Sequence, residues 1–282
     1  MQRCIALIVC LFLPYLNAQE PSKKAAAAPA AAAPTAPYVE RYEKQINFFP
    51  GGKLQVSAAV PGNVKIVGWG KGSIRVEAER IVYYLPPEDA KALLQKFPIR
   101  VRYTPTTATV QTTGSAPPPA TIEFNLIVYV PSEKTDLKIQ VSRGDLSLES
   151  VNGWVEASIQ EGSLDAKSMA GYFSFSTQRG DICAEMAGSR WNGLEFAALT
   201  KQGSVELRLP KKYDAALQLE TRDGKVVVNY PPQEVDGELM PPEIVISKKA
   251  QSLKASVGDG GAPIRLSTHS GDITLLLIPI GN

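Results

Sequence analysis

The chain has 282 residues and a formal net charge of only +2 at pH 7. This near-neutral balance, without a basic cluster, argues against a nucleic-acid partner. The single histidine, His269, also leaves little material for the histidine-dependent triads and zinc sites of many enzymes.

Residues 1–18 are predicted to be a cleaved secretory signal. Arg3 precedes an apolar run from Cys4 to Leu16, and Leu16-Asn17-Ala18 offers a small-residue cleavage site. The run is shorter than the ~20 apolar residues that a membrane-spanning helix needs. We therefore expect an exported protein, periplasmic, at the cell surface or secreted, that is not transmembrane. Residues 19–37, almost wholly Ala and Pro, are predicted to form a disordered tether.

The folded domain is expected to span residues 38–282 as one unit. From Phe48 to Val141, apolar and polar residues alternate in the manner of β strands. One helix is predicted over Pro86–Phe97, because proline and acids fill its first turn and Pro98 ends it. A helix at this place would cover an open end of a strand stack.

A repeat follows in which glycines recur every nine residues and each is followed two positions later by an apolar residue. The match is closer at eighteen residues than at nine, because the segment from Gly153 aligns with that from Gly171 and the segment from Gly162 with that from Gly180. Looser copies of the same turn continue to the end of the chain. The predicted turn glycines are Gly144, Gly153, Gly162, Gly171, Gly180, Gly203, Gly224 and Gly271.

Two all-β folds compete for this pattern. A repetitive parallel β-solenoid, similar to a β-helix, would stack each half-unit on the one eighteen residues later. An antiparallel meander or sandwich would close a hairpin at each glycine, and Asn152-Gly153 is a strong hairpin dipeptide. The preference for eighteen over nine favours the solenoid, with one short helix on its N-terminal side.

Three features recur together over about residues 46–280 and the segment before them: the signal, an early strand like Val64–Trp69 and turns such as Ser270-Gly271-Asp272-Ile273. In these features the chain resembles the bacterial putative adhesin family, also known as the DUF4097 domain. The resemblance implies an exported β-solenoid-like domain without enzymatic activity, and it supplies no catalytic residues.

Trp154 and Tyr172 are the candidate ligand-binding residues. They occupy the same position of successive repeats, so their rings should lie one above the other on the surface. Such a pair can hold a sugar ring, or it can simply shield a turn. Thr177, Thr200, Thr221 and Thr268 also share a position, three residues before a turn glycine, and are predicted to form a stabilising ladder.

A carbohydrate-active enzyme is the alternative from another class. Asp145 and Asp181 would lie two rungs apart, at roughly 9.6 Å, close to the upper limit for an inverting pair of carboxylates, and Asp165 is a further candidate. Both Asp145 and Asp181 follow a turn glycine, where aspartate is also favoured for backbone hydrogen bonding. The units lack the second glycine and regular aspartate of calcium-binding repeats, so no metal or other cofactor is expected.

These observations favour a non-catalytic adhesin-like or scaffold protein that presents a repetitive surface to a cell-envelope component, a glycan or another protein. Self-association is a further expectation, because the open end of a strand stack can polymerise. After export Cys183 is the only cysteine left, since Cys4 and Cys10 leave with the signal, and no internal disulfide is expected.

Overall fold

The structure is a computed structural model that describes residues 36–114, 121–188, 193–210, 213–229, 233–235, 238–240, 243–246, 251–257 and 260–278. All of them belong to the compact unit from Thr35 to Asn282. The predicted signal and all but the last two residues of the predicted tether lie outside the described residues.

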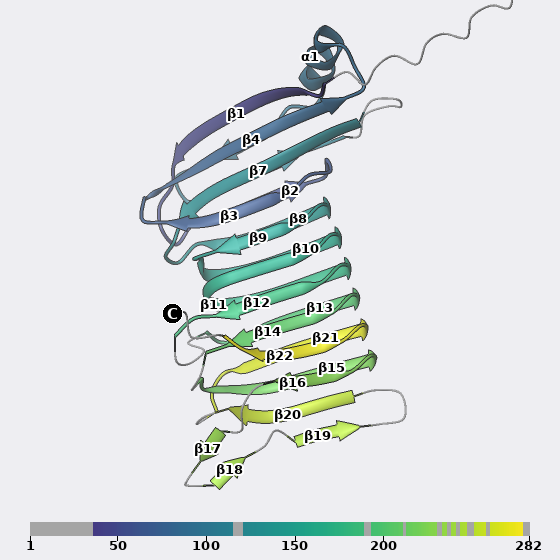
Figure 1. Ribbon diagram of the computed structural model, residues 1–282. Coiled ribbons are helices and arrows are strands. Elements are labelled where there is room, and N and C mark those ends of the chain that lie inside the picture. The colour runs from purple at the N-terminus through teal and green to yellow at the C-terminus, as the bar shows by residue number, and fades with distance from the viewer. Residues whose placement is uncertain are drawn as a thin grey trace, which may run out of the picture. The chain divides into compact units, whose positions relative to one another are not determined.

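Most of the described strands belong to two facing sheets, A and B (Figure 1). In hydrogen-bonded order, sheet A contains β1 (Tyr38–Asn47), β4 (Ser73–Tyr83), β7 (Thr121–Pro131), β3 (Val64–Trp69), β9 (Leu146–Glu149), the first part of β11 (Leu164–Arg179), β12 (Ile182–Met186), β14 (Val205–Leu209), β22 (Ile273–Leu277) and β16 (Val226–Asn229).

Sheet B contains, in the same sense, β5 (Arg100–Tyr103), β6 (Thr107–Thr112), β2 (Lys53–Ala58), β8 (Asp136–Arg143), β10 (Asn152–Glu161), the second part of β11, β13 (Phe196–Gln202), β21 (Pro263–Ser270), β15 (Ala215–Asp223), β20 (Gln251–Val257) and β19 (Glu243–Ile246). The short strands β17 (Gln233–Val235) and β18 (Glu238–Met240) form a separate antiparallel pair.

The repeating unit, which we call a rung, is one strand of sheet B, a glycine turn and one strand of sheet A. From β8–β9 to β11–β12, neighbouring rungs pair in parallel with the predicted offset of eighteen residues, so that Gly153 lies opposite Gly171 and Leu164 opposite Ile182. Asn152-Gly153 therefore begins β10 instead of closing a hairpin. Inward side chains such as Val155, Ile159 and Leu164 are buried between the sheets, as alternation along each strand requires.

The prediction of an all-β chain with one short helix is confirmed, whereas parallel pairing is observed in the central part only. At one end β1, β4 and β7 pair antiparallel, as do β5 and β6. At the other end β15, β20 and β19 pair antiparallel. The glycine repeat did not predict these antiparallel pairs, because their strands lie before the regular period begins or after it ends.

The rungs do not follow one another in chain order. The last rung of the chain, β21 and β22, lies between β13–β14 and β15–β16, with which it pairs in parallel on both sides. Likewise the first rung, β2 and β3, lies between β6–β7 and β8–β9. The chain thus inserts a rung near each end of the stack. In Figure 1 the yellow strand β21 lies between the green strands β13 and β15, and the blue strands β2 and β3 lie between teal strands.

The four threonines of the predicted ladder are all buried at the glycine turns. In each of the last three rungs of the stack, the threonine hydroxyl donates to the carbonyl oxygen of the turn glycine in the preceding rung. These hydrogen bonds join Thr200 to Gly180 at 2.9 Å, Thr268 to Gly203 at 2.8 Å and Thr221 to Gly271 at 2.8 Å. Thr177 donates to the Thr200 hydroxyl oxygen at 2.7 Å. Because a buried hydroxyl costs stability unless it is paired, this ladder favours one register between neighbouring rungs.

The helix α1 (Pro87–Gln95) lies within the predicted range. Proline near its start and the acids Glu88 and Asp89 in its first turn suit a helix N-terminus. Ala90 and Leu94 are buried, and the Leu94 carbonyl oxygen accepts a hydrogen bond from the Arg80 guanidinium at 3.3 Å. α1 therefore packs on β4 and β1, the two strands that end sheet A on this side.

Candidate functional site

Several hollows lie on the outer face of sheet B, which is turned away from the core, and two of them are large grooves. The first, which we call the aromatic groove, has a volume of about 570 Å³, and its lining includes Lys53, Gln55, Thr107, Asp136, Lys138 and Trp154. These residues come from four adjacent strands, β6, β2, β8 and β10. Their side chains point outward because each alternates with a core residue of the same strand.

Trp154 and Tyr172 lie side by side at the edge of the aromatic groove. They are direct partners in the β10–β11 register, and their ring centroids are 4.0 Å apart with an angle of 31° between the planes. Trp154 remains 45% exposed, and its indole Nε1 donates to the Glu156 carboxylate at 3.3 Å. The pair offers an apolar surface next to polar groups, a combination found at sites that bind amphipathic ligands.

The two aspartates that follow turn glycines form part of a hydrogen-bonded ladder along the turns. Asp145 Oδ1 accepts from the Ser163 backbone N–H at 2.8 Å, and Asp181 Oδ1 accepts from the Ser204 backbone N–H at 2.7 Å. The same contact occurs at both ends of the ladder. Asn63 Oδ1 accepts from the Asp145 N–H, and Asp272 Oδ1 accepts from the Lys225 N–H. We call this row the turn ladder. Its carboxylates are occupied in stacking one rung on the next.

Asp165 lies apart from these two acids, on the outer face of sheet A. Its Oδ2 forms an ion pair with Lys167 Nζ at 3.0 Å, and its register partner on β12 is Cys183. None of the three aspartates lines either groove. The structure therefore does not gather the candidate acids around a common cleft.

Cys183 is free and half-buried, with its thiol 3.8 Å from the Glu206 carboxylate. Burial is the main cause that raises the pKa of the Cys183 thiol. Because the thiolate is the reactive form of cysteine, this environment disfavours nucleophilic chemistry at Cys183.

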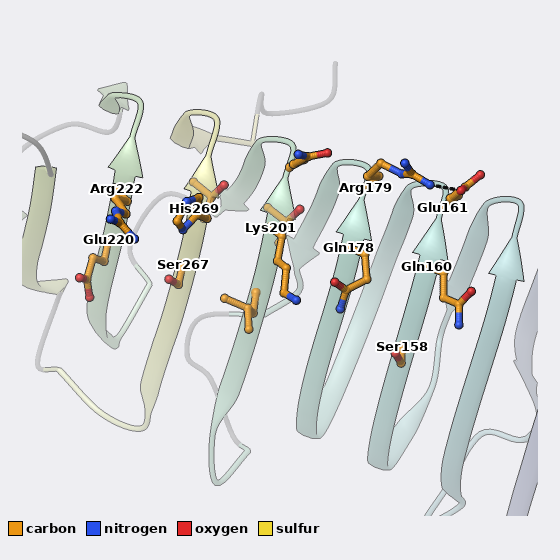
Figure 2. Close-up of a pocket in the computed structure, with 14 residues that line it drawn as sticks. Ser158, Gln160, Glu161, Gln178, Arg179, Lys201, Glu220, Arg222, Ser267 and His269 are labelled. Atoms are coloured by element: carbon orange, nitrogen blue, oxygen red, sulfur yellow. Dashed lines mark hydrogen bonds and ion pairs between the residues drawn. The ribbon is translucent and has the colours of Figure 1, made fainter.

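The second groove, which we call the basic groove, is larger, with a volume of about 1070 Å³. It extends across β10, β11, β13, β21 and β15 near the glycine turns (Figure 2). His269 lies in it, 4.0 Å from the Asp223 carboxylate. Five lining residues share one repeat position, two before the turn glycine, and this shared position was the only signal for the surface in the sequence: Gln160, Gln178, Lys201, Arg222 and His269.

At one end of the basic groove Glu161 lies between two arginines. Its carboxylate forms ion pairs with Arg143, at 2.9 Å, and with Arg179. The hydrogen bond from Arg143 is the main cause that lowers the pKa of Glu161. The chain contains two Arg-Gly-Asp tripeptides, at residues 143–145 and 179–181. In both, the arginine forms an ion pair with Glu161 and the aspartate accepts a hydrogen bond from the next rung.

Substitution of Asp181 tests its structural role in the turn ladder. Asp181→Asn keeps a carbonyl oxygen that can accept the Ser204 N–H, as Asn63 does elsewhere in the turn ladder, so we expect less than about 0.5 kcal/mol of lost stability. Asp181→Ala leaves that N–H without its partner, and we expect a loss of about 1 kcal/mol. Urea denaturation of the two variants measures the difference. Equal losses in both would contradict the structural role.

Within the described part of the chain there is no group of three or more His, Cys, Asp or Glu side chains placed to hold a metal ion. In the same residues, no helix has the length and apolar character to cross a bilayer.

No protein-family model matches the chain. No curated protein matches it either. Among solved structures, it is similar to a "putative cell adhesion protein" from Clostridium sporogenes, with 12% identity, a TM-score of 0.36, and coverage of 85% of this chain and 100% of the other. It is also similar to a "putative adhesin" from Bacteroides fragilis, with 14% identity, a TM-score of 0.28, and coverage of 85% and 97%. A third, the "putative adhesin" from Parabacteroides merdae, shows 10% identity, a TM-score of 0.29, and coverage of 85% and 96%. At these scores the likeness is distant and carries no conclusion about function.

Proposed function

We propose that this chain is an exported, non-catalytic scaffold of the adhesin-like, DUF4097 type. Its solenoid-like stack of rungs presents the outer face of sheet B to a glycan of the cell envelope. The observation that carries the proposal is the aromatic pair Trp154–Tyr172, in which Trp154 is exposed beside a groove of polar side chains. An exposed indole against a polar groove can pack on the apolar face of a sugar while neighbouring groups bind its hydroxyls.

The turn ladder supports the absence of catalysis. Acid–base work on a glycosidic bond needs two carboxylates that flank the bond. Asp145 and Asp181 instead accept backbone hydrogen bonds, and Asp165 is ion-paired on the opposite sheet. The residues best placed for a hydrolase thus have structural partners.

Glycan-array binding tests the proposal. We expect the protein to bind a defined subset of bacterial or host glycans, and Trp154→Ala to weaken that binding about ten-fold, because truncation removes the packing surface. Phe49→Ala is the matched control, since Phe49 is a 64% exposed aromatic outside the groove, and it should bind as the unchanged protein does.

Two results would overturn the proposal. One is an array without specific binding, or with binding that Trp154→Ala leaves unchanged. The other is turnover of a bound polysaccharide that Asp181→Asn abolishes, which would assign the chain to the carbohydrate-active enzymes.

A further inference from the structure

The basic groove contains a row of three basic side chains that chain order does not predict. In the β13–β21 register the residues on either side of Lys201 pair with those on either side of His269, which places the two side by side. The flanking pairs of the β15–β21 register place Arg222 beside His269 in the same way. The three residues therefore occupy successive strands, spaced about 4.8 Å apart along the stack. His269 comes between the other two because β21 is inserted between β13 and β15, as Figure 2 shows.

The charges of this row are weakly compensated within the protein. In the part of the chain that the structure describes, neither Lys201 nor Arg222 forms an ion pair, whereas Arg179 in the next rung is paired with Glu161. His269 lies 4.0 Å from Asp223, and Glu220 also borders the groove. Two cations thus face solvent from the same groove, with a histidine between them.

On the side of Lys201 away from His269, uncharged hydrogen-bonding groups continue the row onto β11 and β10. The flanking pairs place Gln178 beside Lys201, and Gln160 beside Gln178, so amide side chains occupy the next two rungs. Ser158 and Ser267 border the groove on the side away from the turns. Across the five strands, the row extends for about 19 Å, long enough for several units of a linear ligand.

We propose that the basic groove binds a linear anionic polysaccharide, one that carries carboxylate or sulfate groups, along the direction in which the rungs stack. Lys201 and Arg222 hold its anionic groups, and the glutamines and serines bind its hydroxyls. This site is separate from the aromatic groove and does not depend on the glycan proposed for Trp154.

A polysaccharide fits this surface better than a nucleic acid does. Single-stranded nucleic acids are bound by aromatic side chains that stack on the bases, in grooves of strongly positive charge. The lining of the basic groove contains no aromatic ring other than the His269 imidazole, and the chain is nearly neutral. Alternating amide, hydroxyl and cationic groups instead match a ligand that is rich in hydroxyls and carries spaced charges.

Binding of oligogalacturonate, a linear chain of carboxylated sugars, tests the site. We expect the protein to bind it, and Lys201→Gln with Arg222→Gln to weaken the binding at least about ten-fold, because both charge-assisted contacts are removed. The fully methyl-esterified oligomer, which has the same sugar chain without charge, should bind weakly to every variant. Isothermal titration at low and moderate salt measures these affinities, and salt should weaken binding of the charged oligomer.

Arg100→Gln with Arg102→Gln is the matched control. It removes the same charge from the same sheet, because both arginines are exposed on β5, outside the row and outside the lining of either groove. The proposal is overturned if this control weakens binding as much as the double change in the row. It is also overturned if the unchanged protein does not bind the oligomer, or if a single-stranded oligonucleotide competes for the row with equal affinity. Thermal unfolding checks that every variant is folded.

Discussion

Gly162→Ala is expected to destabilise the fold by at least about 3 kcal/mol. Gly162 has a φ of +138°, a conformation that residues with a side chain rarely adopt, and an added Cβ would lie 2.1 Å from the Gly144 backbone carbonyl oxygen of the preceding rung. Neither the strain nor the collision can be relieved by a side-chain movement, because both partners are backbone. Urea denaturation monitored by circular dichroism measures the loss.

Gly70→Ala is the control for this prediction. Gly70 has no atom within 4 Å of an added Cβ and no positive φ, so alanine should leave the stability within about 1 kcal/mol of the original. If Gly162→Ala were as stable as Gly70→Ala, the close stacking of turn glycines would be wrong.

Phe175→Ala is expected to cost about 3–5 kcal/mol, the range for removing a fully buried aromatic side chain. Phe175 is only 1% exposed, and its ring packs edge-on against Phe196 on the next rung, with centroids 5.5 Å apart, and against Phe173 at 5.7 Å. The loss should appear as a lower urea midpoint with a similar slope.

Leu199→Ala serves as the control, because Leu199 is an apolar residue of the neighbouring β13 that is 48% exposed. It should lose less than about 1 kcal/mol. A larger effect at Leu199 than at Phe175 would contradict the assignment of inner and outer faces.

The turn ladder illustrates how far sequence reasoning reached at the candidate site. The position after each turn glycine was visible as Asp145, Ser163 and Asp181, and backbone hydrogen bonding was one of its two interpretations. The structure selects that interpretation, because each side chain accepts the N–H of the next rung. Parallel stacking brings together residues eighteen apart in sequence, so a local pattern carried this information.

The basic groove shows the opposite situation. Lys201, Arg222 and His269 belong to copies of the repeat separated by irregular spacings, and no local pattern states which copies are neighbours. A strand edge can pair with any rung of compatible register, so the order of rungs depends on long-range packing. The antiparallel pair of β15 and β20 and the insertion of β21 decide that order.

Alternation and glycine spacing are local properties of the chain, so they were enough to predict the all-β class, the helix near residue 90, the eighteen-residue offset and the faces of the strands. The antiparallel ends, the order of the rungs and the row of basic residues depend instead on long-range packing. Backbone hydrogen bonds between rungs are nearly the same for every pair, so their order is selected by side chains that meet only after distant segments have come together.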